Sequence, residues 1–272
     1  MLRGKRPTSP RLRRTRRSPK GVGGSEERVS TKQKNFVSAT RCGVLLLLSE
    51  HLTREGVPHG FTSRTHGFGA RYRGERDREQ LSRALNLPRL AYMKQVHGRS
   101  IRTIHGNEPV PECDGVTTKE RDLGLIVHSA DCVPLLFWAS DVNAVAAVHA
   151  GWRGTLARVA VEAVSSLGGR PDKIHVAIGP SIRACCFEVG DEVVEAFHAS
   201  GRELKRILRE GLRGRRHVDL ITDNCDQLVA CGIPEAQIYD SGRCTVCEND
   251  RFYSYRREGK GVGRLMGVIA VK

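Results

Sequence analysis

Long hydrophobic runs are absent from this 272-residue sequence. The longest apolar stretches, such as 44–48, fall far short of the roughly 20 residues that a membrane-spanning helix needs. The sequence therefore predicts no membrane association. Its hydrophobic content of 39% is nevertheless enough to fill the core of one sizeable domain or two small ones, which excludes wholesale disorder.

Acidic and aromatic residues are almost missing from the first 40 residues. No acid precedes Glu26 and no aromatic residue precedes Phe36, whereas residues 1–34 contain twelve lysines and arginines against two acids. This segment thus carries +10 of the formal net charge of +15. Because its Arg, Ser, Pro and Gly cannot bury apolar surface, residues 1–40 are expected to form a basic, disordered N-terminal extension.

A solvated tail is the favoured interpretation of this extension. A nucleic-acid-binding arm and a transit peptide are alternatives, but the segment has neither stacking aromatics nor an apolar stripe. Nucleic acid is therefore not the expected partner. The nine cysteines are odd in number and irregularly spaced, which favours a reducing compartment over a disulfide framework. We predict a cytoplasmic protein.

Residues 41–272 show no linker-like shift in composition and no internal repeat, and they are expected to form one domain. The helical patterns lie at 75–86, 156–167, 191–200 and 219–231. Strand-like runs lie at 57–62, 100–104, 123–128, 133–138, 143–149, 173–178 and 267–271. Helices and strands mix without strict alternation, so the expected fold class is α/β (α+β), with a mixed β-sheet flanked by helices.

Three metal-competent residues, His97, Cys132 and His149, stand where apolar strands meet loops. Each alone has a structural alternative, since a histidine beside a strand is commonly hydrogen-bonded and a buried cysteine is commonly inert. Their spacings match no zinc-finger rule. Together, however, two imidazoles and a thiolate make a three-ligand site with an open fourth position, as in catalytic zinc.

A possible anion site follows His149 directly. The segment Gly151-Trp-Arg-Gly154 leads into the helical pattern at 156–167, so free backbone N–H groups and the Arg153 guanidinium would favour phosphate. An ordinary glycine-rich turn with a solvated arginine is the equal alternative.

The motifs of this chain resemble the YfiH/YlmD-like family, whose members are described as laccase-domain or multicopper polyphenol oxidases and as purine nucleoside phosphorylases. The resemblance runs from about Val44 to the C-terminus. Its motifs are Lys94-Gln-Val-His-Gly98, Cys113-Asp-Gly-Val-Thr-Thr118, Ser129-Ala-Asp-Cys132, His149-Ala-Gly-Trp-Arg-Gly154, Ile178-Gly-Pro-Ser-Ile182, Cys186-Phe-Glu-Val-Gly190 and Phe252-Tyr-Ser-Tyr-Arg-Arg257.

The resemblance implies a YfiH-like fold over 41–272, zinc bound by His97, Cys132 and His149, and phosphorolysis of adenosine, inosine, guanosine and methylthioadenosine, together with adenosine deamination. Phosphate is then a co-substrate, and Arg64, Gln95 and Arg153 are the predicted substrate- or phosphate-binding residues. One departure concerns Thr62-Ser-Arg-Thr-His-Gly67, where His66 replaces a family glycine. The stretch 68–80 is also shortened, so one wall of the pocket is expected to differ.

Catalysis on this scheme needs Cys132 and His149 as ligands and a carboxylate that moves protons. In deamination, zinc-activated water would attack the purine carbon that carries the amino group. Asp131 and Glu188 are the candidate carboxylates. Strand alternation would instead let Asp131 orient a ligand histidine.

Three other functions compete with this one. Copper-dependent oxidation is disfavoured because no His-x-His unit occurs, although a lone copper with Met93 or Met266 as axial ligand is conceivable. A metal-independent cysteine hydrolase or amidase would use Cys132 as nucleophile and His149 as base. Nucleic-acid binding through the tail is the third. Editing of peptidoglycan precursors, attributed to relatives, and a homodimer both stay open.

Two further features have plain interpretations. Cys244-Thr-Val-Cys247 has zinc-knuckle spacing, but no second Cys-x-x-Cys exists to complete four ligands. The vicinal pair Cys185 and Cys186, like Cys225 and Cys231, is therefore expected to pack as small apolar groups. In the basic stretch 251–264, Arg256 or Arg264 could hold phosphate, although a solvated face is the more usual outcome.

Overall fold

The computed structural model describes residues 35–70, 74–106, 112–211 and 214–272, apart from the side chain of His66. Residues 1–34, for which the sequence analysis predicts disorder, lie outside these ranges. Residues 36–40, which the sequence analysis assigns to the extension, instead belong to a strand, Phe36–Arg41, that pairs with residues 44–49 in antiparallel register. The described residues belong to one compact unit.

The first sheet has six strands and is antiparallel except for one edge, where β4 runs parallel to β7. The C-terminal strand β15 lies between β3 and β7, so the two ends of the domain share this sheet. In order across the sheet the strands are β1 (Phe36–Arg41), β2 (Val44–Ser49), β3 (His59–Thr62), β15 (Leu265–Ile269), β7 (Leu123–Ser129) and β4 (Arg89–Tyr92).

The second sheet also has six strands and is mixed, with parallel pairs at both edges. Every residue of its central strands β8 and β9 is buried, as continuous apolar sequences predict for strands covered on both faces. In order the strands are β14 (Ile238–Asp240), β10 (Ile174–Ile178), β8 (Val133–Ala139), β9 (Ala144–Ala150), β6 (Gly115–Thr118) and β5 (Ile101–Thr103).

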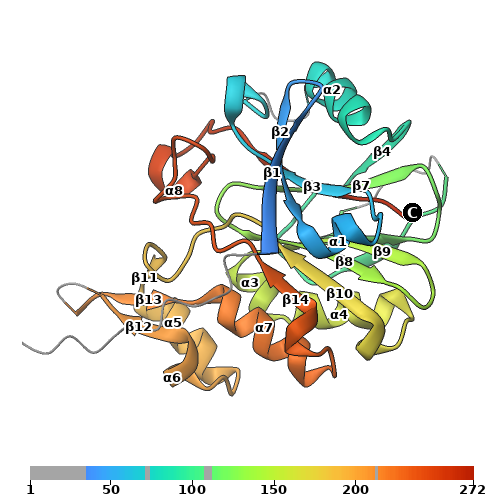
Figure 1. Ribbon diagram of the computed structural model, residues 1–272. Helices are drawn as coiled ribbons and strands as arrows, with labels where there is room; N and C mark the ends of the chain where they lie inside the picture. Colours follow the sequence, from blue (N-terminus) through green and yellow to red (C-terminus); the bar gives the residue numbers. More distant parts are fainter. Residues whose placement is uncertain (1–34, 71–73, 107–111, 212–213) are drawn as a thin grey trace, which may run out of the picture. The chain divides into compact units, whose positions relative to one another are not determined.

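A shared core joins the two sheets face to face, with Leu125 and Val127 from β7 against Leu136 of β8 and Ala147 of β9. Helix α2 covers the other face of the first sheet, and α4 and α7 cover the other face of the second (Figure 1). The helices are α1 (Glu50–Arg54), α2 (Glu75–Leu85), α3 (Trp152–Leu156), α4 (Val159–Leu167), α5 (Asp191–Ala199), α6 (Leu204–Ile207), α7 (Leu220–Ala230) and α8 (Tyr255–Glu258). Short 3₁₀ turns occupy Thr65–Gly67, Pro171–Lys173 and Glu235–Gln237.

A small third sheet follows the order β11 (Glu188–Val189), β13 (Arg216–Val218) and β12 (Leu208–Glu210). All seven predicted strands and the mixed α/β class are confirmed, although the described residues form three sheets where a single one was expected. The predicted helix at 156–167 is wrong in one respect: it is interrupted at Arg158, whose φ of 66° is left-handed, so that α3 and α4 are separate.

Of the helices in the described ranges, none combines the length and apolar character needed to cross a bilayer.

Candidate metal-binding active site

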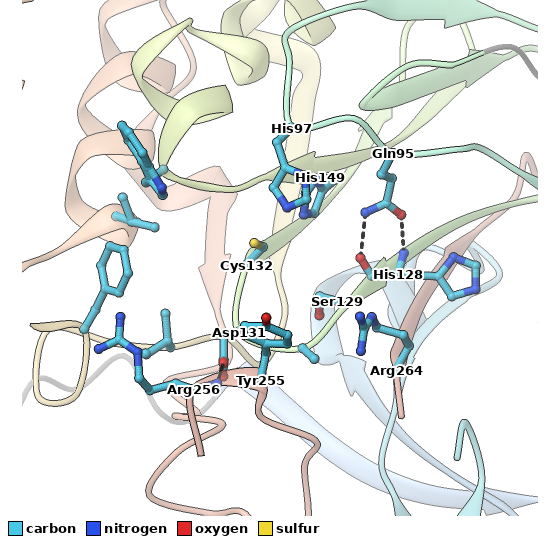
Figure 2. Close-up of a pocket in the computed structure, with 15 residues that line it drawn as sticks. Gln95, His97, His128, Ser129, Asp131, Cys132, His149, Tyr255, Arg256 and Arg264 are labelled. Atoms are coloured by element: carbon cyan, nitrogen blue, oxygen red, sulfur yellow. Dashed lines mark hydrogen bonds between the residues drawn. The ribbon is translucent and has the colours of Figure 1, made fainter. Parts of the chain in front are cut away.

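The three predicted ligands converge. Cys132 immediately precedes β8 and His149 lies near the end of β9, and the antiparallel register pairs Pro134 with His149, so both side chains lie at one end of this hairpin. His97 comes from the loop between β4 and β5. One ligating atom of each residue lies within 4.8 Å of the others. Figure 2 shows the two imidazoles above the Cys132 sulfur, where His97 is exposed and His149 is buried.

Glycine makes this approach possible. A Cβ atom at Gly151 would lie 3.2 Å from the Cys132 Sγ and 3.3 Å from the His97 Cδ2, tighter than ordinary contact. Because Gly151 has no side chain, the backbone that follows His149 passes close to the three ligands without this crowding.

Asp114 supports the two histidine ligands from behind. Apart from its place in the motif at 113–118, no sequence signal indicates this role. Strand β6 pairs with β9, which sets Asp114 beside His149, and its carboxylate accepts a hydrogen bond from the His149 Nδ1 at 2.8 Å. The same fully buried carboxylate accepts from the backbone N–H groups of His97 at 2.9 Å and Gly98 at 2.6 Å. It thus fixes the orientation of one ligand and the loop that carries another, including the left-handed His97 backbone with φ 61°.

The electrostatics favour a thiolate at Cys132. Burial opposes ionisation, but the positive charge of His149 and hydrogen bonds from His149 and His97 lower the pKa of Cys132 to about 6. Burial likewise opposes the charged form of His149, yet the Cys132 charge and Asp114 raise its pKa to about 9. Burial tends to raise the pKa of Asp114, but hydrogen bonds from His149 and Gly98 hold it below its usual range. Cys132 is therefore ionised near neutral pH, as a metal ligand or a nucleophile must be.

A cavity of about 570 Å³ opens beside the ligands, within the range of small-molecule sites. Its wall combines aromatic side chains with two guanidinium groups and the polar ends of β7 and β8 (Figure 2). The lining residues are Gln95, His97, His128, Ser129, Ala130, Asp131, Cys132, His149, Trp152, Ile182, Phe187, Leu220, Tyr255, Arg256 and Arg264.

Gln95 and Asp131 line this cavity, but their polar atoms are engaged in holding backbone. The Gln95 amide exchanges two hydrogen bonds with the backbone of His128, at 2.8 and 2.9 Å. The Asp131 carboxylate accepts from the Thr245 Oγ1 and the Arg256 N–H, each at 2.6 Å. Neither of these contacts involves a ligand histidine, and the orienting role considered for Asp131 belongs to Asp114 instead.

Three predicted site residues are not among those that line the cavity. Glu188 lies on β11, where its carboxylate pairs with Arg215 at 2.8 Å. Arg64 donates to the Asn249 carbonyl and pairs with Glu258, both at the segment that leads through α8. Arg153, in the five-residue helix α3, is exposed and its guanidinium stacks on the Trp152 ring. The proton-transfer role predicted for Glu188 and the substrate- or phosphate-binding roles predicted for Arg64 and Arg153 stay predictions. Arg256 and Arg264 supply the positive charge of the cavity.

Comparison with known proteins agrees with the motifs. Residues 60–272 match the family model described as "Multi-copper polyphenol oxidoreductase laccase". The chain belongs to this family. Within it, the chain is 35% identical over 252 residues to "Purine nucleoside phosphorylase" of Deinococcus radiodurans, which covers 85% of this chain and 95% of that protein. It is 44% identical over 155 residues to "Adenosine deaminase RL5" of an unknown prokaryotic organism, covering 56% of this chain and 59% of that protein.

The fold agrees as well. The crystal structure of YlmD from Geobacillus stearothermophilus superposes with a TM-score of 0.79 at 31% sequence identity, covering 88% of this chain and 99% of that one. The resemblance to YfiH/YlmD-like proteins that the motifs indicate is therefore confirmed.

Proposed function

We propose that this protein is a zinc-dependent purine nucleoside phosphorylase that also deaminates adenosine. The carrying observation is the convergence of His97, Cys132 and His149 within 4.8 Å beside a cavity of nucleoside-accommodating size. The names of the relatives, a purine nucleoside phosphorylase and an adenosine deaminase, support the choice of substrate class.

The donor set fits zinc better than copper. Two imidazoles and a thiolate, with a carboxylate behind one imidazole, are the ligands and the supporting partner typical of catalytic zinc sites. The internal methionines considered as axial copper ligands, Met93 and Met266, are both fully buried in core clusters and are not among the residues that line the cavity. A zinc ion held by the three ligands would supply Lewis-acid polarisation and lower the pKa of water.

The remaining cavity residues bind and orient the two substrates. Phosphate is expected between Arg256 and Arg264, which enter the cavity from opposite sides (Figure 2), because guanidinium groups match phosphate oxygens in geometry and charge. Trp152, Phe187 and Tyr255 offer apolar faces for a purine base. Asp131 acts by holding the backbone of Arg256 in place, and Gln95 by holding the end of β7.

The test is nucleoside turnover by the full-length protein with inosine and with adenosine, each with and without inorganic phosphate. We expect hypoxanthine from inosine only when phosphate is present, and ammonia from adenosine in either condition. His149→Ala should abolish both reactions, whereas His105→Ala, at an exposed position, should retain them. Full turnover by His149→Ala would overturn the proposal. So would release of hypoxanthine from inosine at the same rate with and without phosphate.

A metal-independent cysteine hydrolase is the second candidate, because one observation favours it. Cys132, with a pKa lowered to about 6, faces His149, which is held in turn by Asp114, an arrangement of nucleophile, base and orienting acid. The two candidates differ in their response to a chelator. A zinc enzyme loses turnover and regains it with added zinc, whereas a cysteine hydrolase keeps its activity and accumulates an acyl-enzyme.

A further inference from the structure

Four cysteines outside the candidate active site converge at a second place. Cys185 and Cys186 lie in the turn before β11, and Cys244 and Cys247 lie in the loop after β14. Their sulfur atoms all lie within 4.8 Å of one another. The distances from Cys247 are 3.7 Å to Cys185 and 3.4 Å to Cys186, and Cys185 lies 3.6 Å from Cys244. All four are free thiols.

These spacings are those of a tetrahedral metal site. Sulfur ligands at about 2.3 Å from zinc lie about 3.8 Å from each other at the corners of a tetrahedron. We propose that Cys185, Cys186, Cys244 and Cys247 bind a second zinc ion, which is structural because all four coordination positions are taken by protein. A four-cysteine zinc site usually takes its second pair of ligands from another Cys-x-x-Cys unit. Here the adjacent residues Cys185 and Cys186 supply that pair.

The backbone around the cluster holds the sulfurs in place without any metal. Ser181 and Cys244 form a parallel bridge, and the Thr245 N–H donates to the Ser181 carbonyl at 3.1 Å, which joins the two cysteine segments. The Cys186 N–H closes its own turn on the Arg183 carbonyl at 2.8 Å. The four thiols thus belong to two tied loops rather than to independent surface side chains, and the expectation that the vicinal pair packs as small apolar groups was wrong, since Cys185 is exposed.

The local charges suit a tetrathiolate centre, which carries a net charge of −2 with zinc. Two guanidinium groups from α8 reach the backbone of both cysteine segments: Arg257 donates to the Val246 carbonyl at 3.3 Å and Arg256 to the Glu188 carbonyl at 2.9 Å. These guanidinium groups can offset part of that charge.

The proposed zinc site would also brace the wall of the catalytic cavity. Thr245, one residue after Cys244, donates to Asp131, and Asp131 also accepts from the Arg256 backbone. Since Asp131 directly precedes Cys132, the hydrogen bond from Thr245 links the segment of Cys244 and Cys247 to the candidate catalytic ligand. The two metal sites nevertheless share no ligand.

The experiment measures zinc per chain by elemental analysis of the full-length protein, purified under reducing conditions, for the native chain and four variants. Cys244→Ser should lose one zinc relative to native, whereas Cys42→Ser, which changes an exposed cysteine outside both clusters, should lose none. His149→Ala should keep the second zinc, and X-ray absorption at the zinc edge of that variant should show four sulfur neighbours at about 2.3 Å.

Because Cys244 is buried, its serine variant could fail to fold. Cys247→Ser changes an exposed cluster member and provides the same comparison on folded protein. Equal zinc content in native protein and in both cluster variants would overturn the proposal. So would a zinc-edge spectrum of His149→Ala with nitrogen neighbours, or a protein mass two hydrogens lower that reducing agent restores, which identifies a redox disulfide instead. Any of these results leaves the nucleoside proposal untouched, because that proposal rests on different ligands.

Discussion

Asp114→Asn perturbs the candidate active site without touching a ligand. The carboxylate accepts from the His149 imidazole and from three successive backbone N–H groups, at distances of 2.6 to 3.3 Å. Asparagine keeps the shape but removes the negative charge, and its NH₂ group must face one of these donors. Loss of a carboxylate behind a histidine ligand typically weakens metal binding by about 10- to 100-fold, which corresponds to about 1.4 to 2.8 kcal/mol.

The assay is competition for zinc between the protein and a chromogenic chelator, which gives the apparent Kd. Asp114→Asn should raise that Kd by about 10- to 100-fold, and Asp172→Asn, which alters a surface carboxylate, should leave it unchanged. A thermal melt run in parallel separates a folding defect from a local one. If the folded Asp114→Asn protein binds zinc as tightly as the native protein, then Asp114 does not orient His149 and our description of the site is incorrect.

Two predictions concern stability. Gly179→Ala would place a Cβ 2.3 Å from the Phe61 ring where the two sheets meet, so it should lower the free energy of unfolding by about 1 to 3 kcal/mol, and Phe61→Leu in the same chain should recover part of this loss in urea titrations. Additive losses in the double variant would contradict the packing argument. Burial lowers the pKa of His59 to about 4. The unfolded chain therefore takes up the proton first, and stability should fall as pH drops from about 6.5 to 4, by about 2 kcal/mol at pH 5. His59→Gln should show a correspondingly smaller loss between pH 7 and pH 5, and an unchanged slope would refute the assignment.

The strands and the three ligands could be predicted from the sequence because each is marked locally. Apolar runs identify β8 and β9; Cys132 stands directly before the first run and His149 near the end of the second. Side-chain contacts that depend on which strands pair, and in which register, could not be predicted in this way. Asp114 meets His149 only because β6 pairs with β9, and nothing in the spacing of the two residues indicates that contact.

The positions of the charged residues were the least predictable. Glu188 and Arg64 belong to motifs, yet each forms an ion pair outside the cavity lining, with Arg215 and Glu258 respectively. Arg153 instead stacks on the Trp152 ring, in a short helix that the left-handed Arg158 separates from α4. Long charged side chains find partners in three dimensions that sequence position does not specify.

An anomalous difference map, collected at the zinc absorption edge from crystals of the purified protein, tests the central claim most directly. We predict a peak bounded by the His97 imidazole, the Cys132 sulfur and the His149 imidazole. A map with no peak between these three side chains, from protein that turns over nucleosides in the crystallisation buffer, would contradict it.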